Sequence, residues 1–517
     1  MFSQLYPLAY IISLASLTGW FYFRDNEVRS DFFRKIFFGS FATFGLSWLF
    51  AAGDFSYKLP ALGRELLILA AVPLLLGLLR KTKWAYFTAL AAVLIALRFF
   101  YFEKLAGTFP QEKDMAATTI GSDAYQLASD GELLVELKEG TQLAAVQSIL
   151  KQFGLTAKPA FQMEDKDATL LDNYYIVDVP DRHVKNLSKI TQAFAATGAV
   201  EWLEENEVIT VAPIEAKPLR KLPEANKKYG LNDPGIENLW GFEALKMDEL
   251  YAVISDKKPD RKALLAILDT GIDAGHEDIK ANFKSTKPKY DADKAGHGTH
   301  CAGIAAAVSN NNRGVASFSQ NNDFVQVTSV KVLSDGGFGS QQTIINGMLE
   351  AADRGADVIS MSLGGFSSQS SQRAYEKAVK YANNKGAIVV AAAGNSNRNA
   401  KDFSPANVPG VIAVSAVDTL LGRASFSNLV HDLNMAVAAP GVKIYSTFPG
   451  NKYQTLNGTS MAAPYVSGLV ALMKSLDPAL TTRQVFDLLD NTGADTKSTY
   501  ETGRLIQPGA AVRKLLE

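Results

Sequence analysis

The chain has 517 residues, too many for one hydrophobic core, so we expect several domains. Its net charge of −1 gives no electrostatic reason to expect a nucleic-acid partner. Its one cysteine, Cys301, excludes an intrachain disulfide, so the fold must be stable without one.

Residues 1–108 contain four apolar stretches: Leu5–Phe23, Ile36–Gly53, Leu66–Leu79 and Trp84–Phe102. A membrane-crossing helix needs roughly 20 mainly apolar residues, so we predict a four-helix transmembrane region in the lipid bilayer. The third stretch is the weakest candidate because it is short and contains a proline. A cleaved signal peptide is less favoured, because a basic start and a small-residue cleavage site are both missing.

Basic residues predict the orientation of this region. They are concentrated in the first loop (Arg24–Lys35) and the third loop (Arg80–Lys83), which should therefore be cytoplasmic. With four crossings, everything after Phe102 lies on the extracytoplasmic side. If the third stretch does not cross, the rest of the chain faces inward.

Residues 109–128 have the composition of a polar linker, and residues 129–213 have the pattern of a small α+β domain. The order of elements predicts a ferredoxin-like βαββαβ sandwich. Its one histidine, His183, has no clustered partner and is expected at the surface. The expected strands are Leu133–Leu137, Tyr174–Val179 and Val200–Val211, and the expected helices are Leu143–Phe153 and Val184–Thr197.

Residues 214–232 are rich in proline and lysine and are expected to form an exposed linker, where proteolysis is easiest. From 233 to 517 the pattern alternates buried strands with helices, which predicts an α/β, doubly wound, mostly parallel sheet. Expected strands are 263–268, 325–332, 358–362, 388–393 and 411–417, and expected helices include 341–354 and 371–385. The active site of such a sheet lies at the carboxyl ends of its strands.

Reactive side chains stand at those ends. Asp269 ends the first strand in "AILDTGID", and Asn395 follows another in "VVAAAGN". His297 and Ser460 each open a helix, in "GHGTHCAGIAAAV" and "NGTSMAAPYVSGLVALM". A serine hydroxyl needs a base, imidazole suits that task near neutral pH, and a buried carboxylate orients the imidazole. Free N–H groups at a helix start and a side-chain amide suit a developing oxyanion.

The chain order Asp, His, Ser differs from that of chymotrypsin-like enzymes and α/β-hydrolases. The segments "ILDTGID", "HGTHCAG", "SLGG", "AAAGN" and "GTSMAAPYVSG" resemble the signature segments of the subtilase family. The resemblance implies a subtilisin-like fold and serine endopeptidase activity. It makes Asp269, His297 and Ser460 the catalytic triad and Asn395 an oxyanion donor.

The resemblance also implies a substrate-binding segment at Ser362, Leu363, Gly364 and Gly365, where the glycines let a peptide approach as an added strand. We assign Gly394 to the same substrate-binding set. We further expect Phe403 near the floor of the pocket for the residue before the scissile bond, favouring small or medium side chains.

Each assignment has a competitor. His300 competes with His297, Asp273 and Asp278 are alternative acids, and a lone serine before a helix is usually only an N-cap. Cys301 resembles a feature of the proteinase K branch, but a small buried residue is the favoured interpretation. We expect His276 and His431 to be structural or exposed, and Tyr465 stands where many relatives carry histidine.

The segments "GELLVELKEG" and "VEWLEENEVITV" resemble the inhibitory prodomain of subtilases, whose tail occupies the active site until it is cut. An unrelated α+β spacer is the alternative. The stretch "SNNNRGVASFS" partly resembles a family calcium loop, with Asp278 as a remote ligand, but it is shortened. Calcium prefers six to eight oxygens, so we assign no metal ligand and expect no required cofactor, with structural Ca²⁺ the less favoured alternative.

The sequence therefore predicts a membrane-anchored serine endopeptidase that acts on polypeptides through an acyl-enzyme intermediate. We expect it to be made as a zymogen, with its own prodomain as an intramolecular inhibitor. Two alternatives are a catalytically silent binding protein with a protease fold and a membrane sensor that gates the protease.

Overall fold

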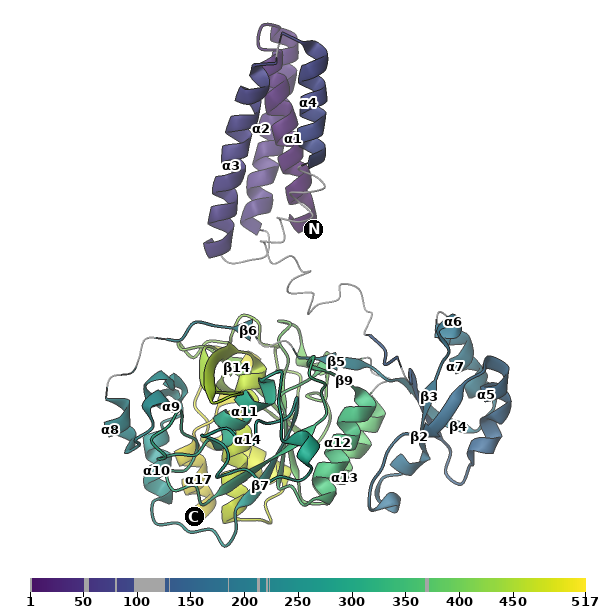
Figure 1. The fold of residues 1–517 in the computed structure, drawn as a ribbon, viewed down its shortest axis with the longest axis vertical. Coiled ribbons are helices and arrows are strands. Elements are labelled where there is room, and N and C mark those ends of the chain that lie inside the picture. The colour runs from purple at the N-terminus through teal and green to yellow at the C-terminus, as the bar shows by residue number, and fades with distance from the viewer. Residues whose placement is uncertain are drawn as a thin grey trace. The chain divides into compact units, whose positions relative to one another are not determined.

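The computed structural model describes residues 2–50, 55–79, 81–96, 126–129, 131–184, 186–211, 214–219, 222, 224–367 and 372–517. The chain forms two compact units, Met1–Ala124 and Tyr125–Glu517 (Figure 1). This boundary falls inside the predicted 109–128 linker. The predicted boundaries between 129–213, 214–232 and 233–517 lie within the second unit and stay predictions.

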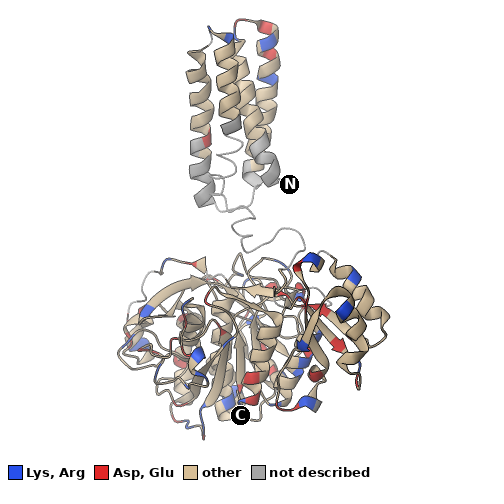
Figure 2. Ribbon diagram, turned by 45° about the vertical axis from the view of Figure 1, so that its right-hand side comes forward, with Lys and Arg blue, Asp and Glu red and all other residues tan. Residues whose placement is uncertain are grey.

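The first unit contains four helices: α1 (Phe2–Tyr22), α2 (Glu27–Phe50), α3 (Phe55–Gly77) and α4 (Lys83–Ala96). Helices α1 and α2 pack through residues such as Tyr10 and Phe44, whose ring centroids are 5.3 Å apart. Charged residues gather around the α1–α2 connection (Figure 2).

Within the described residues, every helix falls short of the combined length and apolar character needed to cross a membrane. The prediction of four transmembrane helices is therefore not supported. Helix α2 begins nine residues before the predicted Ile36 start and includes charged side chains from Glu27 to Lys35. Helix α4 is described over 14 residues, and the end of the predicted Trp84–Phe102 span lies outside the described residues.

The second unit opens with a four-stranded antiparallel sheet in the order β2-β3-β1-β4. Its strands are β1 (Leu133–Leu137), β2 (Thr156–Pro159), β3 (Tyr174–Asp178) and β4 (Val200–Glu205). Helices α5 (Gln147–Phe153) and α7 (Leu187–Ala196) share one hydrophobic cluster with Leu133 and Val135. The chain order β1–α5–β2–β3–α7–β4 is the predicted βαββαβ arrangement.

The predicted strand Val200–Val211 is wrong as a single element. Strand β4 ends at Glu205, and β5 (Val208–Thr210) forms a separate two-stranded antiparallel sheet with β9 (Phe338–Ser340). Asn206 stands at the break: its Nδ2 donates to the Gly131 carbonyl at 2.7 Å, and its Oδ1 accepts from Gln342 N at 3.0 Å. These bonds hold the chain where it leaves one sheet for the other.

The large sheet has seven strands in the order β18-β15-β14-β12-β10-β7-β8, and every neighbouring pair is parallel. The predicted strands all appear, as β7 (Ala263–Asp269), β8 (Val325–Lys331), β10 (Val358–Met361), β12 (Ile388–Ala392) and β14 (Val411–Val417). The sequence analysis did not predict β15 (Ala436–Pro440), β18 (Arg504–Leu505) or the hairpin of β16 (Ile444–Phe448) and β17 (Lys452–Asn457).

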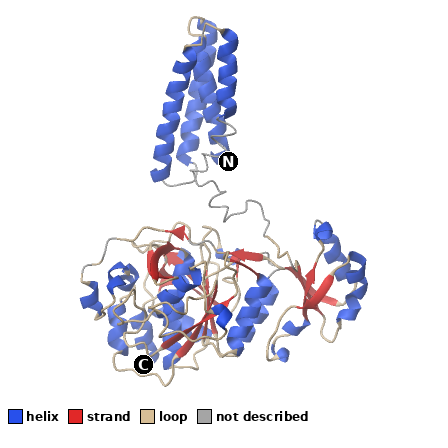
Figure 3. Ribbon diagram, in the orientation of Figure 1, coloured by secondary structure: helices blue, strands red, loops and turns tan. Residues whose placement is uncertain are grey.

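Helices cover both faces of this sheet (Figure 3). Because side chains alternate along a strand, Ala266 and Leu268 of β7 pack with α12 (Gln341–Asp353) and α13 (Arg373–Asn384). Leu265 and Ile267 pack with α11 (His297–Ala306) and α14 (Thr459–Leu476). The doubly wound prediction is confirmed. The strand order reverses beside β7, so the carboxyl end of β7 is a switch point of the kind where ligands bind.

Candidate active site

Asp269 and His297 meet at the carboxyl end of β7. His297 Nδ1 lies 2.8 Å from Asp269 Oδ1 and 2.9 Å from Oδ2, and both side chains are buried. Helix α11 can pack closely against the backbone that follows β7 because residue 298 is glycine. A Cβ on Gly298 would lie 2.1 Å from the Gly271 carbonyl oxygen. The bond to Asp269 leaves His297 Nε2 as the ring nitrogen available for proton transfer.

The charge state of His297 is set by opposing effects. Burial lowers the pKa of His297, but the charge and hydrogen bond of Asp269, helped by Asp293, raise it above its ordinary value. Asp293 also caps helix α11: its Oδ1 accepts from Gly296 N at 2.8 Å and its Oδ2 from Thr299 N at 2.9 Å. A carboxylate at this helix start therefore holds the His297 segment and favours the imidazolium.

Ser460 occupies the first turn of α14, and its backbone is held in an unusual way. Pro464 has no N–H to donate to the Ser460 carbonyl, as the residue four positions on normally would. Ser362 Oγ supplies that donor at 2.8 Å, and Cys301 Sγ lies 3.4 Å from the same oxygen. Ser460 Oγ donates to the Ser362 carbonyl at 2.9 Å.

The described contacts include no hydrogen bond between Ser460 Oγ and His297. Helices α11 and α14 nevertheless pack together, and Cys301 on α11 contacts the Ser460 backbone. Catalytic hydrogen bonds are often long in free enzymes and tighten only when substrate binds, so this geometry is compatible with a serine–histidine pair.

Asn395 and the Ser460 N–H converge on one point. Asn395 Oδ1 accepts from Thr459 N at 2.8 Å and from Thr459 Oγ1 at 2.9 Å, which fixes the amide and turns Nδ2 away from Thr459. A Cβ built on Gly458, whose φ is +154°, would lie 3.5 Å from both Asn395 Nδ2 and Ser460 N. The two nitrogen donors therefore lie near one another at the start of α14, where a negative oxygen would be stabilised.

The predicted substrate-binding residues lie together. Strand β11 (Gly365–Phe366) pairs antiparallel with β13 (Phe403–Ser404), and Ser362, Leu363 and Gly364 lead into it. Phe403 is buried, with its ring edge against Phe366. A Cβ on Gly394 would lie 3.3 Å from Phe403 Cδ1, so the glycine leaves room for that ring.

The segment around residue 210 lies along this same edge. Ile209 of β5 is buried, and its Cγ1 lies 3.4 Å from the Cβ position of Gly365. Val211 N donates to the Gly337 carbonyl at 2.8 Å. Beyond residues 212 and 213, β6 (Ile214–Glu215) pairs antiparallel with β17, with Ile214 opposite Asn457. The described segments before residue 212 and after residue 213 therefore both pair with strands of the 233–517 region.

The competing residues have other partners. His300 Nε2 lies 3.0 Å from the Gln454 carbonyl, and burial lowers the pKa of His300 to about 3, so it stays neutral. Asp273 Oδ2 accepts from Gly450 N at 2.8 Å. His276 Nε2 lies 3.0 Å from the Lys452 carbonyl, and His431 stacks on Tyr500. In the small domain, His183 is half-buried with its ring against Phe153.

Two places in the described residues bring possible metal ligands together. The described residues bring Asp269, His297 and Cys301 within 4.8 Å of one another, but burial raises the pKa of the Cys301 thiol well above its ordinary value, which disfavours the thiolate. At the shortened loop, Asp278 Oδ1 accepts from Asn311 Nδ2 at 2.7 Å and Oδ2 from Val315 N at 2.7 Å. Nitrogen donors fill the place that oxygens would need to occupy around calcium, so these residues do not fit the ion.

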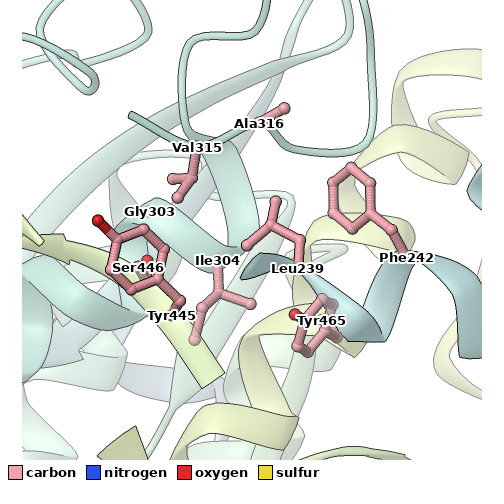
Figure 4. Close-up of a pocket in the computed structure, with 9 residues that line it drawn as sticks. All are labelled: Leu239, Phe242, Gly303, Ile304, Val315, Ala316, Tyr445, Ser446 and Tyr465. Atoms are coloured by element: carbon pink, nitrogen blue, oxygen red, sulfur yellow. The ribbon is translucent and has the colours of Figure 1, made fainter. Parts of the chain in front are cut away.

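A small cavity lies between α11, α14 and the 239–242 segment (Figure 4). Ile304, Tyr465 and Leu239 are among the side chains around it, and it is too small for anything larger than a water molecule. Tyr465 thus serves packing here.

The sequence analysis missed two supporting residues, Asp293 and Thr459. Asp293 lies three residues before the N-cap Gly296, so the usual N-cap preference did not single it out. Thr459 carried no signal of its own, because its role depends on where the Asn395 loop lies.

Comparison with known proteins places these features in a family. The model of the subtilase family matches residues 260–505. Subtilisin DY of Bacillus licheniformis is 42 % identical over 282 residues, covering 53 % of this chain and 98 % of that protein. The chain belongs to the subtilase family. It is a subtilisin-like serine endopeptidase, and its sheet is the subtilisin-like parallel sheet.

Two further relatives cover different shares of this subtilase. Thermitase of Thermoactinomyces vulgaris is 43 % identical over 218 residues, covering 41 % of this chain and 75 % of thermitase. The thermophilic serine proteinase of Bacillus sp. strain AK1 is 33 % identical over 382 residues, covering 72 % of this chain and 86 % of that protein. That second similarity extends well beyond residues 260–505.

Proposed function

We propose that Asp269, His297, Ser460 and Asn395 form the catalytic machinery of this endopeptidase. The observation that carries the proposal is the pair of Asp269–His297 hydrogen bonds beside a helix start where Ser460 N and Asn395 Nδ2 converge. A binding module has no need for an oriented imidazole and two convergent donors at one place.

In this mechanism His297 Nε2 takes the proton of Ser460 Oγ as the oxygen attacks the substrate carbonyl carbon. The Ser460 N–H and Asn395 Nδ2 stabilise the resulting oxyanion, and Asp269 stabilises the imidazolium. His297 then protonates the leaving amine, which leaves an acyl-enzyme. Water hydrolyses that ester with His297 acting again as base.

The backbone of Ser362–Gly365 and the side chain of Phe403 would form the substrate side of the cleft. Phe403 is buried beside Gly394 and Phe366. Its ring would therefore make the pocket for the residue before the scissile bond shallower. We propose a preference for small or medium side chains before the scissile bond. A peptide library that returns large aromatic residues at this position refutes it.

The segment 129–213 is proposed to be an inhibitory prodomain, which makes the chain a zymogen. Its contacts with helix α13 support this role. Glu136 pairs with Arg373 at 3.0 Å and with Lys377, and Glu204 Oε1 accepts from Ala374 N at 3.2 Å at the start of α13. Strand β5 then pairs with β9, and Ile209 lies beside Gly365 of the proposed substrate-binding segment.

We infer that the enzyme works on the extracytoplasmic side of a membrane and is attached to the lipid bilayer through residues 1–108. The uncharged run Leu5–Phe23 and the basic residues of Arg24–Lys35 support it. Protein that stays with membranes after alkaline carbonate washing agrees with attachment. Recovery in the washed-off fraction contradicts it.

The catalytically silent binding protein is the competing function. A casein or peptide hydrolysis assay on the wild-type chain and on Ser460→Ala, both after trypsin nicking of the 214–232 linker, distinguishes the two. Hydrolysis by the wild type alone supports the proposed machinery. Equal background rates in both chains favour the silent protein.

A further inference from the structure

Thr270 directly follows the proposed catalytic acid and is fully buried. Thr270 N donates to Asp269 Oδ1 at 2.7 Å, and the same oxygen lies 2.8 Å from His297 Nδ1. The Thr270 hydroxyl donates to Asp293 Oδ1 at 2.9 Å and accepts from Gly298 N at 3.0 Å. The residue after the acid is therefore hydrogen-bonded to the residue after the base.

Asp293 connects the same threonine to the other side of His297. Its Oδ1 also accepts from Gly296 N at 2.8 Å. Its Oδ2 accepts from Thr299 N at 2.9 Å and from Thr299 Oγ1 at 2.8 Å. Asp293 is itself buried, where hydrogen bonds are stronger than in water. The residues before and after His297 are thus both held by one Thr270–Asp293 pair.

The start of helix α11 depends on these two side chains. A helix start leaves its first N–H groups without helical partners, and a side chain at the N-cap position normally supplies an acceptor. Helix α11 has glycine, Gly296, at that position, so the acceptors must come from elsewhere. Thr270 and Asp293 supply them, and they tie the helix that carries the base to the strand that carries the acid.

We propose that the Thr270 hydroxyl and the Asp293 carboxylate form a positioning bridge, which holds the His297 imidazole in the orientation that accepts the Ser460 proton. The proposal rests on the proposed function, because it assumes that His297 is the base. A displacement of about 1 Å near the chemistry can cost about 10²-fold in rate. The bridge should therefore act on kcat. KM should change little, because neither side chain belongs to the proposed substrate-binding segment.

The charge of Asp293 gives the bridge a second effect that can be measured separately. Burial lowers the pKa of His297, and the negative charges of Asp269 and Asp293 raise it. The ascending limb of kcat/KM against pH reports the pKa of the base in the free enzyme. Removal of the Asp293 charge should therefore move this limb to lower pH, whereas removal of the Thr270 hydroxyl should leave it in place.

Other ionisable groups face this site from its own helix and from β8. On α11, burial lowers the pKa of His300, which stays neutral, and raises the pKa of the Cys301 thiol. From β8, Lys331 pairs with Asp335, which also pairs with Lys294. All of these groups are unchanged in the variants below, so they do not account for a shift of the limb.

Helix α14 and strand β16 pack on the remaining sides of α11. The ionisable side chains that they bring there are two tyrosines, Tyr445 and Tyr465, which carry no charge near neutral pH. The charge of α14, Lys474, is bound near the opposite end of that helix, where its Nζ donates to the Gly386 carbonyl at 3.0 Å.

The test compares full-length chains after trypsin nicking of the 214–232 linker, with active sites counted by fluorophosphonate label. Thr270→Val removes the hydroxyl and keeps the side-chain shape, and it should lower kcat by about 10–100-fold with KM and the pH profile little changed. Thr270→Ser keeps the hydroxyl and should behave as the wild type. Asp293→Asn should lower kcat and also move the ascending limb to lower pH.

Asp357→Asn is the matched control, because Asp357 is also a buried carboxylate but lies at the opposite, amino end of β7. Its Oδ2 accepts from Leu264 N at 2.8 Å and from Arg261 Nη1 at 2.7 Å. This variant should be less stable in urea unfolding, with kcat per active site and the pH profile unchanged.

Any of four results overturns the bridge. They are a wild-type kcat in Thr270→Val, a loss in Thr270→Ser as large as in Thr270→Val, an unshifted limb in Asp293→Asn, and the same changes in Asp357→Asn. If Thr270→Val does not fold, Asp293→Asn decides, since the position of the limb does not depend on how much enzyme is folded. These results overturn the bridge alone when the wild type carries label on Ser460. An unlabelled Ser460 in the wild type removes the proposed function, and the bridge with it.

Discussion

Ser362 and Ser460 exchange two hydrogen bonds between the segment after β10 and the first turn of α14. Ser460 Oγ donates to the Ser362 carbonyl at 2.9 Å, and Ser362 Oγ donates to the Ser460 carbonyl at 2.8 Å. The second bond exists because Pro464 leaves that carbonyl without its helical partner. The nucleophile is thus positioned by the segment proposed to bind substrate.

Ser362→Ala removes the hydroxyl that satisfies the buried Ser460 carbonyl. Cys301 Sγ is the remaining partner, and a thiol is a weak donor. We expect the free energy of unfolding to fall by about 1–2 kcal/mol, with a lower kcat and little change in KM. Urea unfolding in a Ser460→Ala background and peptide hydrolysis in the active background measure the two effects.

Cys301→Ala is the matched control for Ser362→Ala, because it removes only the weaker contact at 3.4 Å. Its effect on both measurements should be smaller. A larger loss for Cys301→Ala than for Ser362→Ala contradicts this account of the Ser460 carbonyl.

Asn395→Ala should lower kcat by about 10²–10³-fold, the loss found on removing one oxyanion-hole donor in subtilisin, with KM little changed. The physical reason is that Nδ2 contributes only when negative charge develops on the substrate oxygen. Steady-state kinetics on one peptide substrate measure the effect. An enzyme that works at the full rate without Asn395 contradicts the assignment.

Glu204 should make stability depend on pH. Burial raises the pKa of Glu204 from its ordinary 4.5 to about 8, so the folded chain holds a proton that the unfolded chain releases. A raised pKa gives a stabilising contribution that is complete below pH 4.5 and is lost as pH rises through 8. Both chains are compared in a Ser460→Ala background by urea unfolding at pH 5 and pH 9. The free energy of unfolding should fall more between these pH values in the chain that keeps Glu204 than in Glu204→Gln.

The loss of unfolding free energy between pH 5 and pH 9 should differ between the two chains by on the order of a few kcal/mol, since each pKa unit corresponds to about 1.4 kcal/mol. Glutamine keeps an oxygen that can accept from Ala374 N, so the fold should tolerate it. Parallel pH profiles for the two chains contradict the raised pKa.

Chelation should leave the thermal stability unchanged. Asp278 already accepts two N–H donors where a calcium ligand would face the ion. An ion bound at 100 times its Kd would stabilise the chain by about 2.7 kcal/mol, which a thermal scan detects as a shift of Tm. A Tm that rises with added Ca²⁺ and falls with EDTA, and no longer does so in Asp278→Asn, contradicts the prediction.

The sequence predicted the central sheet well because its strands carry local signals. The seven residues of β7 are all buried, as a continuous apolar run indicates for an interior parallel strand. Asp269, His297, Asn395 and Ser460 were assigned from their places at strand ends and helix starts. The fold then brings each of them to one edge of the sheet.

Other features depended on non-local partners and were missed. Residues 200–211 are rich in β-branched side chains throughout, and nothing local reveals that Val208–Thr210 pairs with Phe338–Ser340 instead of continuing β4.

The four transmembrane helices were inferred from apolar runs alone. The described helices in that region also include charged turns such as the start of α2.

Fluorophosphonate labelling after trypsin nicking of the 214–232 linker tests the central claim most directly. The account predicts that one label is attached, that peptide mapping locates it on Ser460, and that His297→Ala slows labelling severely while Ser460→Ala abolishes it. Label on a different residue, or equal labelling of the wild type and Ser460→Ala, would contradict it.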